Sequence, residues 1–137
     1  MRWMSLDIGQ KRIGVAISDE SETFAFPLTV IERTRVVEDV KAVLALVVEH
    51  DVAGLVVGEP LELSGAAGAA VLRTRAFTDA LTAVYDGEVV FVDERFSTAE
   101  AERMLVSADA SRARRRQVVD KVAAAVILQQ YLERKKS

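Results

Sequence analysis

The order of apolar segments along the chain is the feature that most constrains its fold. Three short apolar runs flank turns at the start, and helical and extended patterns then alternate. In chain order, the pattern predicts strands over 2–7, 13–18 and 28–31, helix 35–50, strand 53–57, helix 69–85, strand 89–92 and helices 97–106 and 117–134. A meander followed by alternating helices and strands predicts an α/β fold with a mixed sheet and helices on both faces.

Several local signals refine these elements. Thr34 is expected to cap helix 35–50, and Ser97-Thr98-Ala99-Glu100 has the form of a capping box. Pro27 is expected at a loop edge. Residues 122–128 are all apolar, which predicts a final helix that is buried on every side.

The composition of the chain excludes several kinds of functional site. A chain of 137 residues predicts a single domain, 1–137. It has no cysteine, which excludes disulfides, thiolate metal sites and cysteine nucleophiles. The single histidine, His50, is interpreted as a surface residue or helix cap, so a catalytic metal would have to sit on oxygen ligands. With no long apolar run and Asp7 near the start, the chain is expected to be cytoplasmic, with no membrane partner.

Charge is strongly polarised along the chain. Residues 112–137 carry eight basic and two acidic side chains, whereas the rest carries 10 basic and 19 acidic ones. A basic segment on an acidic body indicates contact with a phosphate backbone, although a solvated helix end would look the same. We expect Arg112–Arg116 to form a mobile loop that closes over nucleic acid. The expected nucleic-acid-binding residues are Lys11, Arg12, Arg95, Arg112, Arg114, Arg115, Arg116 and Lys121.

Carboxylates follow the expected parallel strands. Asp7, Glu59 and the pair Asp93 and Glu94 fall at strand ends, where ligands bind in open α/β sheets, and Asp120 interrupts the apolar final helix. Each acid alone has an ordinary explanation as a turn former, an ion-pair partner or a helix-end charge. Together they suit Mg²⁺ or Mn²⁺, and two such ions can drive phosphodiester hydrolysis. Asp120 beside a core also requires a cationic partner.

The same residues match a known family. The segments 6–19 (LDIGQKRIGVAISD), 56–61 (VVGEPL), 93–101 (DERFSTAEA) and 119–124 (VDKVAA) resemble the YqgF/RuvX family of Holliday junction resolvases or pre-16S ribosomal RNA nucleases. The resemblance spans nearly the whole chain. It implies an RNase H-like fold, with a five-stranded mixed sheet in the order 3-2-1-4-5 and strand 2 antiparallel.

The resemblance also implies site residues. Asp7 matches the acid of the first strand, Asp93 or Glu94 supplies the second acid, and Asp120 supplies the acid of the closing helix. Strand alternation allows only one of Asp93 and Glu94 to face the metal. Glu59 stands where the family usually has an apolar residue, so it is either a fourth ligand or a loop substitution. Ser97 replaces a more frequent threonine and keeps the capping hydroxyl.

The leading functional prediction is a divalent-metal-dependent nuclease that matures the end of pre-16S ribosomal RNA. The first alternative is a Holliday junction resolvase, which usually acts as a symmetric dimer. The second is a non-catalytic nucleic-acid or ribosome-binding module. An ATP-dependent phosphoryl transferase also opens with an Asp-x-Gly turn, but it needs two large domains. The expected partner is structured RNA or branched DNA, and both monomer and homodimer remain open.

Overall fold

The computed structural model describes residues 1–59, 68–93 and 112–136, with the side chains of the last helix described from 120 to 135. The elements are β1 (Arg2–Ile8), β2 (Arg12–Ser18), β3 (Ala25–Glu32), α1 (Val36–Glu49), β4 (Val52–Glu59), α2 (Ala69–Thr82), β5 (Glu88–Asp93) and α4 (Arg112–Lys136). These are the elements that the apolar pattern predicted; the strands and α4 extend further than predicted, or as far, whereas α1 and α2 are shorter than the predicted helices 35–50 and 69–85. The predicted helix 97–106 lies outside the described residues.

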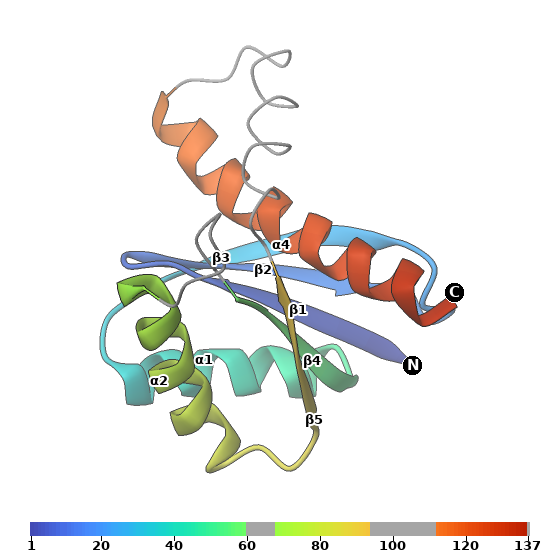
Figure 1. The fold of residues 1–137 in the computed structure, drawn as a ribbon, viewed down its shortest axis with the longest axis horizontal. Coiled ribbons are helices and arrows are strands. Elements are labelled where there is room, and N and C mark those ends of the chain that lie inside the picture. Colours follow the sequence, from blue (N-terminus) through green and yellow to red (C-terminus); the bar gives the residue numbers. More distant parts are fainter. Residues whose placement is uncertain (60–67, 94–111, 137) are drawn as a thin grey trace.

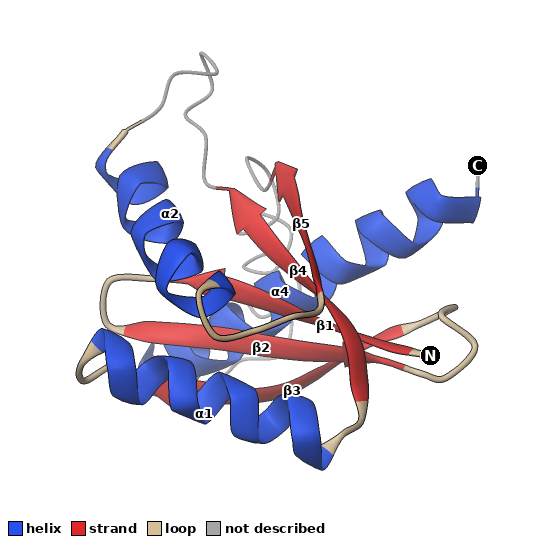
Figure 2. Ribbon diagram, turned by 90° about the horizontal axis from the view of Figure 1, so that it is seen from below, coloured by secondary structure: helices blue, strands red, loops and turns tan. Residues whose placement is uncertain are grey.

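The five strands form one sheet in the order β3-β2-β1-β4-β5. β2 runs antiparallel to both β1 and β3, whereas β4 runs parallel to β1 and β5. Helices α1 and α2 cover one face of this sheet and α4 crosses the other (Figure 1). The view in Figure 2 shows α1 and α2 in front of the strands and α4 behind them. The predicted α/β class, strand order and two-sided helix packing are confirmed.

Each strand divides its side chains between two cores. Met4 and Leu6 of β1 pack with α1 and α2, which defines the α1/α2 face. Trp3 packs with α4 on the opposite side, the α4 face. Ser5 also points to that side, and its hydroxyl donates to the carbonyl of Ala124 at 2.6 Å. The alternation therefore assigns every position of a strand to one face.

Helix α4 packs its apolar run against the sheet but is not buried on every side as predicted. Ile127 and Leu128 are fully inaccessible, whereas Val122 and Val126 remain partly exposed. The helix begins at Arg112 rather than 117, so the expected loop over Arg112–Arg116 is wrong. Arginine, alanine and glutamine have high helix propensity, and a helix already nucleated by packing extends through them without an apolar stripe. Among the described helices, none is long and apolar enough to cross a membrane.

The start of α1 differs from the expected threonine cap. Arg35 occupies the N-cap position and makes no side-chain capping bond. Instead, the carboxylate of Asp39 reaches back and accepts hydrogen bonds from the backbone N–H and the hydroxyl of Thr34, at 3.0 and 3.3 Å. The hydroxyl of Thr34 is thus a donor, and Asp39 ties the residue before the N-cap to the start of the helix.

Strand β3 is longer than predicted and contains Pro27, which was expected at a loop edge. Pro27 pairs with Ala16 beside an irregularity in the β2–β3 register. Because β3 is an edge strand, a residue without an N–H can be accommodated there.

Asp19 organises the turn between β2 and β3. Its carboxylate accepts hydrogen bonds from the hydroxyl of Ser21 at 2.7 Å and from the backbone N–H groups of Thr23 and Phe24 at 2.8 and 3.1 Å. These hydrogen bonds lower the pKa of Asp19 to about 2, and the bond from Ser21 has the largest effect.

Asp19→Ala is expected to destabilise the protein at neutral pH and progressively less in acid. Because the folded-state pKa lies below the unfolded value of about 3.9, the contribution of Asp19 is complete above pH ~4 and is lost as the pH falls through ~2. Urea unfolding of both proteins at pH 7, 4 and 2.5 measures the difference. A difference in unfolding free energy that stays constant with pH contradicts the assignment.

Candidate active site

Asp7 lies near the carboxyl end of the central strand β1. It is the register partner of Gly14 on β2. Trp3 and Ser5 face α4, so alternation directs Asp7 to the same side. The first predicted acid therefore lies on the α4 face, at the edge of the sheet where the parallel strands end.

Helix α4 approaches the sheet closely at Gly14. A Cβ atom added to this glycine would stand 1.9 Å from the carbonyl oxygen of Asp120 and 2.4 Å from its carbonyl carbon. Only a residue without a side chain permits this contact. Since Asp7 and Gly14 are paired, the crossing brings Asp120 to the same place on the sheet as Asp7. Because α4 begins at Arg112 and not at the predicted residue 117, Asp120 lies in its third turn.

Arg12 is the cationic partner that Asp120 was expected to require. Its Nε donates to Oδ2 of Asp120 at 2.7 Å. The two side chains retain 24% and 26% of their exposure, so the pair lies at the rim of the core and remains open to solvent. The hydrogen bond with Asp120 raises the pKa of Arg12, with a further contribution from the charge of Glu32. The pair fixes the end of the β1–β2 turn against α4.

Glu59 and Asp93 lie on the other side of the sheet. They are register partners at the ends of β4 and β5. Val57 packs on the α1/α2 face and Val92 on the α4 face, so alternation places both acids on the α1/α2 face. There Glu59 forms an ion pair with Arg75 of α2. The structure does not bring Glu59 or Asp93 together with Asp7 and Asp120.

The acidic side chains on the α4 face are of the chemical type that binds a hard divalent cation. Asp7 and Asp120 supply carboxylate oxygens, the ligands that Mg²⁺ and Mn²⁺ prefer. Within the described part of the chain, no three acidic or histidine side chains gather into a metal site. Glu94, the remaining predicted acid, lies outside the described residues.

Some of the predicted basic residues surround these acids. Lys11 is exposed in the β1–β2 turn, and Lys121 follows Asp120 on α4 and is partly exposed. The side chains of Arg112, Arg114, Arg115 and Arg116 lie outside the described residues although their backbone belongs to α4. Arg95 is likewise outside the described residues.

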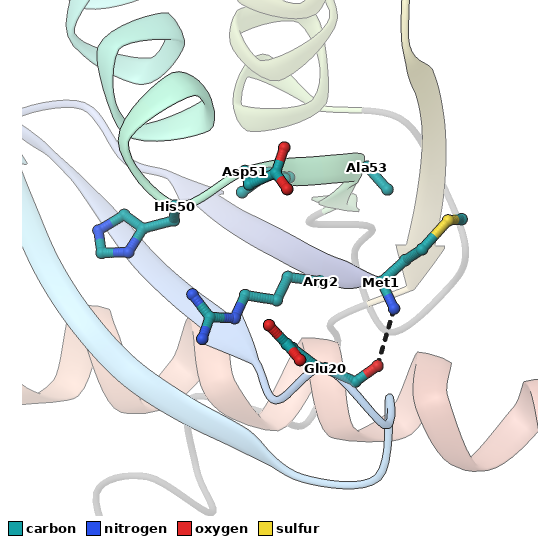
Figure 3. Close-up of a pocket in the computed structure, with 7 residues that line it drawn as sticks. Met1, Arg2, Glu20, His50, Asp51 and Ala53 are labelled. Carbon is teal, nitrogen blue, oxygen red and sulfur yellow. Dashed lines mark hydrogen bonds between the residues drawn. The ribbon is translucent and has the colours of Figure 1, made fainter.

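A cavity of about 470 Å³ lies at the opposite edge of the sheet, where β1 and β4 begin. Figure 3 shows Arg2, Glu20 and His50 around it, with the terminal ammonium of Met1 bonded to the carbonyl of Glu20 at 2.8 Å. His50 ends α1, and its backbone N–H donates to Leu46 at 3.0 Å, as expected of a helix-end residue. Cationic and anionic groups line the cavity in mixture, so no single ligand chemistry follows from it.

Two features of the site were missed in the sequence. Gly14 interrupts an apolar strand, and an isolated glycine in a strand signals close backbone approach, so the signal was present. The buried ion pair of Arg33 and Asp39 behind the β1–β2 turn left no comparable signal. Both residues look like ordinary surface charges flanking a helix start.

Comparison with known proteins agrees with the geometry. The model of the family described as "RuvX: Holliday junction resolvase" matches residues 1–134. A relative from Desulforudis audaxviator, named "Putative pre-16S rRNA nuclease", is 45% identical over 137 residues, covering 100% of this chain and 97% of the relative. A relative of the same name from Caldanaerobacter subterraneus subsp. tengcongensis is 45% identical over 138 residues, covering 100% and 99%.

The fold is also that of solved resolvases. RuvC of Thermus thermophilus, solved in complex with a Holliday junction substrate, superposes with a TM-score of 0.62 at 16% identity, covering 100% of this chain and 96% of that one. At this identity the likeness shows the RNase H-like fold alone. The family match and the relatives show more, because they extend over almost the entire sequence. The chain therefore belongs to the RuvX family, whose description and whose relatives given above carry the names of nucleases.

Proposed function

We propose that this chain is a divalent-metal-dependent nuclease that matures the end of pre-16S ribosomal RNA. One observation carries the proposal: the backbone of Asp120 lies against Gly14, the register partner of Asp7, and the side chain of Asp120 pairs with Arg12 at the end of the neighbouring turn. Acidic groups that can hold a cation thus adjoin basic groups that can hold a phosphate backbone. The names of the relatives support ribosomal RNA as the substrate.

The proposed roles divide between acids and bases. Asp7, Glu94 and Asp120 would hold Mg²⁺ or Mn²⁺; Glu94 is preferred to Asp93, which faces away from Asp7. The metal would activate water and offset the charge that develops on the phosphodiester. Arg12 orients the carboxylate of Asp120, and Lys11 and Lys121 bind flanking phosphates. Glu59 is assigned to the ion pair with Arg75 and to no catalytic role.

Cleavage of Holliday junctions is the second candidate. The family description favours it, and it demands two coordinated cuts, hence a symmetric dimer. Trimming of a ribosomal RNA precursor requires a single active site. The two activities therefore predict different substrates and different assemblies.

A substrate panel tests the proposed function. End-labelled pre-16S RNA, single-stranded RNA and a DNA four-way junction are incubated with Mg²⁺, Mn²⁺ or EDTA. Metal-dependent cleavage of the precursor RNA at its mature end is expected. Symmetric cutting of the junction, with the protein dimeric by sedimentation, would favour the resolvase instead. RNA binding without cleavage under any condition would make the protein a binding module.

Removing phosphate contacts is expected to flatten the salt dependence of RNA binding. Each Lys that contacts a phosphate adds about 0.7–0.9 to the slope of log K against log salt concentration. The variant Lys11→Gln/Lys121→Gln should lower the slope by roughly 1.5, whereas Lys41→Gln on the exposed surface of α1 should not change it. Fluorescence anisotropy between 50 and 300 mM KCl measures both. An unchanged slope in the double variant would remove these lysines from the interface.

A further inference from the structure

Behind the candidate site, on the α1/α2 face, lies a buried ion pair. Nε of Arg33 donates to Oδ2 of Asp39 at 3.3 Å, and the two side chains are 13% and 2% exposed. The guanidinium also lies over the ring of Phe77, 5.3 Å from its centroid. Burying a charge this completely is costly unless it is paired, so Asp39 depends on Arg33.

The other end of the guanidinium reaches the β1–β2 turn. Nη1 of Arg33 donates to the carbonyl of Gly9 at 3.0 Å, and the backbone N–H of Arg33 donates to the carbonyl of Lys11 at 2.9 Å. The turn itself is closed by a bond from the N–H of Gly9 to the carbonyl of Arg12 at 2.8 Å. Arg33 therefore holds two of the four residues of this turn, 9–12, from behind.

The turn connects the two sides of the candidate site. Gly9 follows Asp7 by two residues, and Arg12 ends the turn in its ion pair with Asp120. A shift of the turn would move Asp7 and Arg12 together, because the backbone between them is short and closed. The side chain of Arg33 packs with Asp39 and Phe77 on the α1/α2 face, whereas Asp7 and Asp120 lie on the α4 face, so its effect on these acids passes through the turn.

We propose that Arg33 is a positioning residue that sets the turn 9–12, and that Asp39 and Phe77 fix Arg33 in the required orientation. Asp39 accepts from Thr34 and Arg33 at once, so the first turn of α1 is tied to the same point. A planar guanidinium can satisfy Asp39 and Gly9 with two different nitrogens, which the single nitrogen of a lysine ammonium cannot do in the same geometry. The effect on catalysis rests on the proposed function; the effect on the turn does not.

The test separates positioning from stability by removing one partner or both. Arg33→Gln and Asp39→Asn each leave a buried polar group without its partner and should lower the melting temperature. The double variant Arg33→Gln/Asp39→Asn removes both charges, so most of the melting temperature should return. The Gly9 carbonyl still lacks its arginine donor, so kcat should stay about tenfold to a hundredfold below wild type. Arg33→Lys keeps the charge and should fold, with a similar loss of kcat.

Amide hydrogen exchange provides a readout that requires no substrate. In the double variant and in Arg33→Lys, amides of residues 9–12 should exchange at least about tenfold faster than in wild type, while those of the β1–β4 pairing remain protected. Arg35→Gln, at an exposed neighbouring arginine, is the control and should change neither exchange nor kcat. Recovery of both kcat and slow exchange in the double variant would overturn the proposal. If wild type shows no cleavage, the proposed function fails, but exchange still decides the role of Arg33.

Discussion

Asp7→Asn is expected to abolish metal-dependent cleavage while leaving the fold and RNA binding intact. Asparagine has nearly the same shape but no negative charge, so it binds a divalent cation poorly. Losing several kcal/mol of transition-state stabilisation corresponds to a fall of about a thousandfold in kcat. Because Asp7 is only partly buried, the melting temperature should change little. Single-turnover cleavage of end-labelled precursor RNA in Mg²⁺ measures the loss.

The control is Asp79→Asn, an exposed aspartate of α2 on the other side of the sheet, which should keep the wild-type rate. Binding is compared by anisotropy in EDTA, where cleavage is excluded. If Asp7→Asn retains more than a tenth of the rate, Asp7 is not a metal ligand. If the variant loses RNA binding or unfolds, Asp7 has a structural role and the acid pair requires another explanation.

Gly14→Ala is expected to cause the largest loss of stability of any single methyl addition to the described sheet. The new Cβ would collide with the backbone of Asp120, and a helix backbone cannot rotate away as a side chain can. Overpacking of this kind costs about 3 kcal/mol or more, on the order of 10 °C in melting temperature. If α4 lifts instead, Asp120 leaves Asp7, and a displacement of about 1 Å lowers kcat roughly a hundredfold.

Gly54→Ala provides a matched comparison. This methyl also projects onto the α4 face, but it meets the ring of Trp3, at the end of the sheet remote from Asp120. Both variants should lose stability in thermal unfolding, while only Gly14→Ala should lose cleavage at temperatures where each is folded. Equal loss of cleavage in the two, or an undisturbed Gly14→Ala, would mean that α4 does not depend on this contact.

The sequence predicted the sheet because each strand carries its own local signal. The apolar runs around Leu6, Ile13 and Val56 are short and flanked by turns, and the last two are rich in β-branched residues, so their conformation is decided locally. The start of α4 was not predictable in this way. Residues 112–116 have no apolar stripe, and their helical state depends on continuity with the packed turns that follow.

The candidate site likewise has features that the sequence predicts and features that depend on tertiary packing. The requirement for a cation beside Asp120 was foreseen from its apolar neighbours, and Arg12 meets it. Which acids share a face was not foreseeable from strand ends alone. Glu59 and Asp93 lie near the ends of their strands as Asp7 does. A difference of one position along a strand, however, moves a side chain from the α4 face to the α1/α2 face. The partner of Glu59, Arg75, belongs to a helix whose register against the sheet is a tertiary property.

The hydroxyl of Ser5 bonds to Ala124, and Arg12 pairs with Asp120, so β1 and β2 are joined to residues 119 and 108 positions later. During synthesis at 5–20 residues per second, the partner segment leaves the ribosome roughly 6 to 24 s after Ser5. Throughout that interval the α4 face of the nascent sheet is uncovered, and Asp7 has no companion acid from the helix. On the proposed site, a nuclease built in this order completes its set of acids only after helix α4 has emerged, when all five strands have already been made.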